Sequence, residues 1–173
     1  FLLMAVFVVD PTGLESEAGI AREHHALAYL GALVFSVPGI YLLVKGRRYI
    51  QAPTQTLLIS LTVLLLGLVA MAIGGFVATL VGLWLFFTGF TALEAMLPSL
   101  ASVYAPESSR GTAMGVFASS QFIGVFFGGL LGGLLLELSG TTGVWLGMSL
   151  LTVLWAIVLG VSHSASPETS SAA

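Results

Sequence analysis

This chain has no cysteine and very little charge. Without cysteine it can form no disulfide bond and perform no thiolate chemistry. Charged residues make up 8% of its 173 residues, whereas soluble domains contain about 25%. Only five residues are lysine or arginine and the net charge is −3, so we expect no nucleic-acid partner. Because 57% of the residues are hydrophobic, the lipid bilayer is the solvent that suits this chain.

The sequence also lacks the side-chain patterns of enzymes and metal sites. We find no Ser/His/Asp set, no pair of aspartates and no phosphate-binding glycine loop. The cluster Glu23-His24-His25 does not have the spacing of paired metal ligands on a helix and has no further ligand nearby. We therefore expect no enzyme activity, no cofactor and no metal site.

Long apolar runs predict an all-α membrane protein, because a spanning helix needs about 20 apolar residues. We expect the end of one such helix at residues 1–9, with its start before Phe1, and an external polar connector at 10–24. Transmembrane helices should then occupy residues 25–162, followed by a disordered cytoplasmic tail at 163–173. The helices are expected at about 25–44, 54–72, 77–104, 111–136 and 144–162, with a tight turn at Gly74-Gly75.

The basic residues predict the orientation of these helices. Lys45, Arg47, Arg48 and Arg110 fall in loops that alternate crossing places on one side of the membrane, and the positive-inside rule makes that side cytoplasmic. The first three are interpreted as topology determinants. A gating role, by pairing with acids at another helix end, stays open.

Glu94 is the strongest functional candidate, because it is the only charged residue between Leu57 and Tyr104. An ionised carboxylate in hydrocarbon costs about 2.5–3.5 kcal/mol or more, so such residues usually mark an ion or substrate pathway. Pro98 lacks the N–H that would bond the Glu94 carbonyl, so a kink and a free carbonyl are expected beside the carboxyl group. We predict that Glu94 faces an aqueous cavity and couples proton movement to transport. The alternative is a protonated side chain that bonds a neighbouring helix and serves packing alone.

Further candidates share helical faces with Glu94 or lie on the helix expected at 111–136. Small residues at four-residue spacing allow helices to approach closely, so Gly124, Gly128 and Gly132 are interpreted as packing or gating positions. Pro98 is interpreted in the same way because of the kink that it introduces. Gln121 either bonds a neighbouring helix or lines a substrate cavity. The substrate-cavity candidates are Phe87, Phe90, Thr91, Phe117 and Gln121.

One segment resembles a known family. The stretch LFFTGFTALEAMLPSLASVYAPESSRGTAMGVFASSQFIGVFFGGLLGG, from Leu85 to Gly133, is similar to the tenth and eleventh helices of major facilitator superfamily carriers. The most specific part is A-P-x-x-x-R-G-T-A-M-G, followed by S-Q-F-x-G and the glycine pairs. The similarity is closest to the bacterial drug–proton antiporter branch. The basic segment GIYLLVKGRR resembles a degenerate form of the loop between helices eight and nine.

This resemblance implies that the chain is the C-terminal half of a twelve-helix carrier, comprising the end of helix seven and helices eight to twelve. Carriers of this family bind substrate between two halves, so the missing N-terminal half is an expected partner, together with protons, membrane lipid and a small-molecule substrate. The implied function is secondary active transport in the bacterial inner membrane, as an antiporter for the efflux of lipophilic compounds. The alternative is a carrier-derived membrane module that binds or assembles with partners without transporting.

Overall fold

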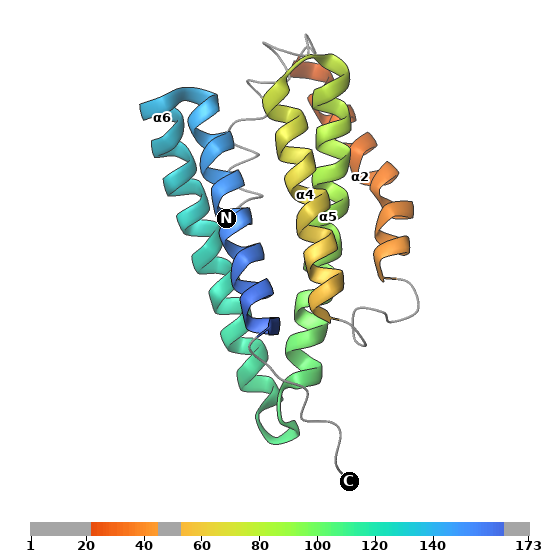
Figure 1. The fold of residues 1–173 in the computed structure, drawn as a ribbon, viewed down its shortest axis with the longest axis vertical. Coiled ribbons are helices and arrows are strands. Elements are labelled where there is room, and N and C mark those ends of the chain that lie inside the picture. Colours follow the sequence, from red (N-terminus) through yellow and green to blue (C-terminus); the bar gives the residue numbers. More distant parts are fainter. Residues whose placement is uncertain (1–21, 45–52, 165–173) are drawn as a thin grey trace.

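The computed structural model describes residues 22–44 and 53–164. In this part of the chain every regular element is helical, which confirms the predicted all-α fold. The elements are α2 (Arg22–Val44), α4 (Pro53–Ile73), α5 (Phe76–Tyr104), the short 3₁₀ helix η2 (Glu107–Ser109) and α6 (Arg110–Ser164). The α-helices lie side by side along the long axis of the molecule (Figure 1).

Several expectations from the sequence lie outside the described residues. These are the helix end at 1–9, residues 10–21 of the connector, the tail from residue 165, and the basic side chains of Lys45, Arg47 and Arg48. Residues 22–24 were expected in the connector but form the first turn of α2. Residues 163 and 164 were expected in the tail but extend α6.

The element α6 consists of two helices joined at Gly140. The backbone of Gly140 has φ 64° and ψ −164°, which no helical residue adopts. Glycine reaches positive φ without the steric penalty that other residues meet. The parts at 110–139 and 141–164 therefore run in opposite directions, and appear in teal and blue in Figure 1. They coincide with the two helices expected at 111–136 and 144–162.

The turn between α4 and α5 lies where the sequence predicted it. Gly74 and Gly75 both have positive φ, at 77° and 86°. The Gly74 N–H donates to the Met71 carbonyl at 3.2 Å, and the Thr79 N–H donates to the Gly75 carbonyl at 2.9 Å. These bonds satisfy backbone groups at the two helix ends, which allows the chain to reverse within two residues.

The core of the described bundle lies mainly between α4 and α5. Its fully buried side chains include Leu61, Leu64, Leu68, Leu83, Phe86 and Met96. Phe86 stacks against Phe90 with ring centroids 5.9 Å apart and an interplanar angle of 7°. The backbones of α4 and α5 also lie very close to each other. A Cβ added at Gly67 or Gly89 would lie 2.6 Å from a backbone atom of the facing helix. The two helices thus form a tightly packed hairpin.

Helix α2 is held against α5 by a hydrogen bond between the helices. The Trp84 indole Nε1–H donates to the Phe35 carbonyl at 2.8 Å. One turn further along α5, a Cβ added at Gly39 would lie 2.6 Å from Thr88 Cγ2. Pro38 lies between these two contacts inside α2. The proline therefore lies at the level where α2 is most firmly attached to its neighbour.

The outer surface of the bundle is suited to lipid. Helices α4 and α5 and the long α6 are each apolar and long enough to cross a membrane, and α2 contributes the shorter apolar segment Tyr29–Leu43. Many large apolar side chains on α2 and α6 are exposed, including Phe35, Tyr41, Phe122 and Leu146. A protein in water seldom exposes such large apolar patches, so the bilayer is the environment that this surface requires.

Candidate functional site: a cavity between α4, α5 and α6

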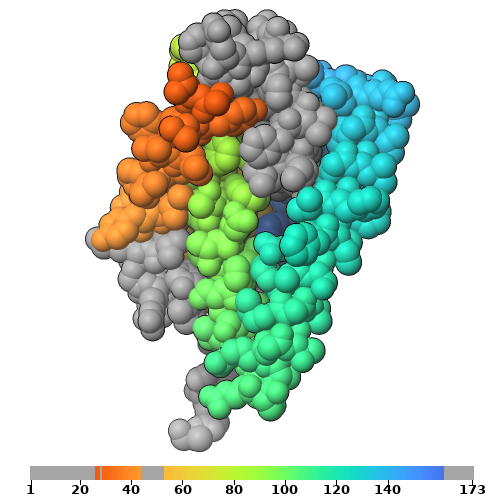
Figure 2. Space-filling model, turned by 180° about the vertical axis from the view of Figure 1, so that it is seen from behind, coloured from red at the N-terminus to blue at the C-terminus, as the bar shows by residue number. Residues whose placement is uncertain are grey.

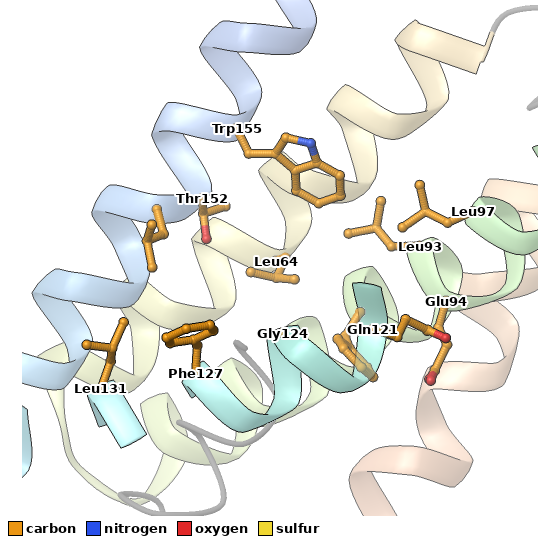
Figure 3. Close-up of a pocket in the computed structure, with 12 residues that line it drawn as sticks. Leu64, Leu93, Glu94, Leu97, Gln121, Gly124, Phe127, Leu131, Thr152 and Trp155 are labelled. Carbon is orange, nitrogen blue, oxygen red and sulfur yellow. The ribbon is translucent and has the colours of Figure 1, made fainter. Parts of the chain in front are cut away.

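A cavity of about 470 Å³ opens between α4, α5 and both parts of α6. Seen from behind, α5 and the first part of α6 border a hollow in which atoms of the second part of α6 are visible (Figure 2). Most of the lining is apolar, and few polar groups interrupt it. The lining residues are Leu64, Phe90, Leu93, Glu94, Leu97, Gln121, Gly124, Phe127, Leu131, Leu151, Thr152 and Trp155 (Figure 3).

Glu94 is the only ionisable residue among the described residues that line this cavity. It lies in the second half of α5, one turn before Pro98, and the helix continues through the proline to Tyr104. The side chain is exposed, and within residues 22–44 and 53–164 it makes no hydrogen bond or ion pair. Its carboxyl group is therefore available to a proton or to a bound molecule.

Gln121 reaches the same cavity from the first part of α6. Its side chain is exposed, and it has no hydrogen-bond partner among the residues that the structure describes. Gly124 and Phe127 also line the cavity. At 3.6 residues per turn, these three positions cover an arc of about 120° of the helix surface. An amide group offers two donors and an accepting oxygen, so Gln121 adds neutral hydrogen-bonding capacity beside the acid.

The structure brings four of the candidates from the sequence together: Glu94, Phe90, Gln121 and Gly124 all line the cavity. Phe87 does not. It lies seven positions before Glu94, so the helix rise separates the two residues by about 10 Å along the axis. The Phe87 ring is 7% exposed and packs edge-to-face against Tyr29 of α2, with centroids 6.3 Å apart.

The remaining candidates are also outside the cavity lining. Thr91, Pro98 and Phe117 are half-buried, and Gly128 and Gly132 are buried. Arg110 is exposed at the first residue of α6. The buried glycines lie on the part of α6 that also presents Gly124 to the cavity, so one face of this helix serves both packing and the cavity wall.

The second part of α6 supplies lining residues that the sequence had not indicated. Leu151, Thr152 and Trp155 form one wall of the cavity. In the sequence, Trp155 was the residue that could have indicated this wall of the cavity. Tryptophan is usually enriched at the membrane–water interfaces, whereas this residue lies well inside an apolar helix and needs another explanation.

A second groove, between α2 and α5, is less suited to a selective site. It has a volume of about 610 Å³ and is lined by Leu27, Gly31, Ala32, Phe35, Pro38, Leu80, Val81 and Trp84. Among the described residues of this groove, the Trp84 indole is the only side-chain hydrogen-bonding group, and its N–H already donates to the Phe35 carbonyl. Selective pockets combine an apolar wall with a few free polar groups, so the cavity at Glu94 is the better candidate.

A bundle of apolar helices that are long enough to cross a membrane, around a mostly apolar cavity with an acid in its wall, defines a multi-pass membrane protein. The sequence matches the Major Facilitator Superfamily over residues 5–173. The chain belongs to this superfamily.

Two relatives illustrate the similarity. The chain is 34% identical to the "Inner membrane transport protein YajR" of Escherichia coli (strain K12) over 159 residues, which cover 91% of this chain and 35% of the relative. It is 26% identical to an "Uncharacterized transporter" of Buchnera aphidicola subsp. Baizongia pistaciae over 160 residues, which cover 91% of this chain and 41% of the relative. The chain thus spans well under half the length of these curated relatives. The family and the apolar helices make it a multi-pass protein of the bacterial inner membrane.

Proposed function

We propose that this chain is part of a secondary active transporter that exports small lipophilic compounds in exchange for protons. The observation that supports this most directly is the cavity, in which a carboxyl group and an amide, neither of which has a partner among the described residues, share a mostly apolar wall. An apolar wall suits a lipophilic compound, and the acid can exchange a proton when the cavity is open to water.

The roles follow from the chemistry of each side chain. Glu94 takes up and releases the coupling proton, Gln121 hydrogen-bonds the substrate, and Phe90 supplies apolar contact. The rest of the carrier, which is an N-terminal half in this proposal, completes the cavity. Superfamily membership and the transporter names of the relatives support membrane transport, and the acid in the cavity supports proton coupling.

The test uses the full-length carrier that contains this chain, reconstituted in proteoliposomes with an imposed pH gradient. Export of a lipophilic fluorescent dye and the accompanying proton movement are measured together. Glu94→Gln keeps the size and hydrogen bonding of the side chain but removes its titration, so dye export should stop responding to the pH gradient. Glu94→Asp should retain part of this response.

Glu137 provides a matched control. It is exposed, lies on the first part of α6 and does not line the cavity. Glu137→Gln should leave export and its pH response unchanged. A Glu94→Gln protein that exports dye with an intact pH response would disprove proton coupling at this residue. A full-length protein that binds dye without moving it would favour the membrane module that does not transport.

A further inference from the structure

The groove between α2 and α5 is closed at one end, where the two helices touch. The Trp84 indole N–H donates to the Phe35 carbonyl at 2.8 Å. One turn further along both helices, a Cβ added at Gly39 would lie 2.6 Å from Thr88 Cγ2. Because residue numbers rise together in these two contacts, the helices run in the same direction. Both begin at the end of the bundle that carries the Gly74-Gly75 turn (Figure 1).

The groove extends from this contact toward that end of the bundle. On α2 its lining runs from Pro38 back to Leu27, eleven positions away, which corresponds to about 16 Å along the helix axis. A Cβ added at Gly31, between these two residues, meets no described atom within 4 Å. The hydrocarbon core of a bilayer is about 30 Å thick, so one leaflet contributes about 15 Å. The groove is therefore as long as one leaflet is deep.

The lining of the groove is suited to hydrocarbon. Its described residues are apolar apart from the Trp84 indole, whose N–H is already bonded to the Phe35 carbonyl. Leu27, Phe35 and Val81 are exposed, and they continue into the exposed apolar surface of α2 and α5. That surface belongs to helices that cross the bilayer, so the groove is continuous with the face that lipid covers.

We propose that this groove binds one acyl chain of a membrane phospholipid. The chain enters at the end of the bundle near the Gly74-Gly75 turn, at the level of the lipid head groups. It ends in the middle of the bilayer, at the contact between Gly39 and Thr88. Without an occupant the walls of the groove lose the dispersion contacts that they can make. An acyl chain restores these contacts and needs no hydrogen bond, which matches the absence of free polar groups among the described lining residues.

The lipid site is separate from the cavity at Glu94, because the two share no described lining residue. The acyl chain is therefore a resident ligand and not the transported compound. It fills the space between the first half of α2 and α5, so that α2 is supported over its length and not only at Phe35 and Gly39.

The test follows Trp84 during a lipid titration. The full-length carrier, labelled with 5-fluorotryptophan, is freed of lipid in detergent, and phosphatidylcholine with a nitroxide near the end of one acyl chain is added back. The ¹⁹F resonance of Trp84, assigned by its loss in Trp84→Phe, should broaden and reach its limit at a stoichiometric amount of lipid. The resonance of Trp145, which is buried and outside the groove lining, should stay sharp at that point.

A matched pair of variants tests the position of the chain. Gly31→Leu fills the groove without meeting a described atom, so the broadening at Trp84 should be lost. Gly115→Leu adds the same side chain on the first part of α6, where a Cβ also meets no described atom within 4 Å, and should leave the broadening unchanged. The titration of the unmutated carrier decides the question even where a variant fails to fold.

Three results would overturn the lipid site. Broadening that rises in proportion to added lipid without a limit would mean that lipid only passes the groove. A resonance that stays sharp at every ratio would mean that another part of the carrier, or a second copy of it, fills the groove. Unchanged broadening in a folded Gly31→Leu protein would place the bound lipid outside the groove.

Discussion

Gly67 of α4 and Gly82 of α5 face each other so closely that neither position has room for a side chain. A Cβ added at Gly67 would lie 2.7 Å from the Gly82 carbonyl oxygen and 2.6 Å from the Phe86 nitrogen. A Cβ added at Gly82 would lie 2.8 Å from the Gly67 carbonyl oxygen. These distances involve backbone atoms, which cannot rotate away as a side chain can. The hairpin of α4 and α5 therefore depends on glycine at both positions.

We expect Gly67→Ala and Gly82→Ala to destabilise the protein by about 1–3 kcal/mol, because overpacking forces the two backbones apart. The measurement is the melting temperature of the purified carrier in detergent. Gly115→Ala is the matched control, since a Cβ added there meets no described atom within 4 Å. An unchanged melting temperature for both hairpin variants would contradict the close approach.

The hydrogen bond between Trp84 and Phe35 should contribute measurably to the attachment of α2. Trp84→Phe keeps an aromatic ring but removes the donor of this 2.8 Å bond. Hydrogen bonds between membrane helices contribute about 0.6 kcal/mol on average and up to about 1.7 kcal/mol, so a modest decrease in stability is expected. Trp145→Phe makes the same truncation at a buried ring for which the structure gives no hydrogen bond among the described residues. Equal losses in the two variants would mean that ring size, and not the hydrogen bond, is responsible.

The two hypotheses for Gln121 predict different results. If the amide lines the cavity, Gln121→Leu should reduce dye export and change stability by less than about 0.5 kcal/mol, as is usual for a site without buried partners. If the amide instead bonds another helix, the same substitution should lower the melting temperature and export together. Parallel measurements of melting temperature and export on one preparation separate these outcomes.

Phe87 and Phe90 are close in sequence but should differ in their effects. Phe87 is buried against Tyr29, so Phe87→Ala should lower stability by about 3–5 kcal/mol, the usual range for a buried phenylalanine. Phe90 lines the cavity, so Phe90→Ala should reduce dye export. Its loss of stability should be smaller than that of Phe87→Ala. A larger stability loss for Phe90→Ala than for Phe87→Ala would contradict the placement of these rings.

The sequence alone determined the elements of this protein. Hydrocarbon offers no hydrogen bonds, so an apolar run must form a helix that satisfies its own backbone. The pair Gly74-Gly75 predicted one turn, whereas the turn at Gly140 became known only from its positive φ in the structure. The sequence also singled out Glu94 and Gln121, because polar side chains in apolar helices are conspicuous.

Only the tertiary structure decided which residues share a cavity. Helical periodicity gives the direction of a side chain around its own axis, but it does not give the height at which a neighbouring helix crosses. For this reason Phe87 and Glu94, which share a face of α5, have different surroundings, and Phe87 packs against α2. For the same reason Trp155 lines the cavity from the second part of α6, because the turn at Gly140 brings that helix back along the first part of α6.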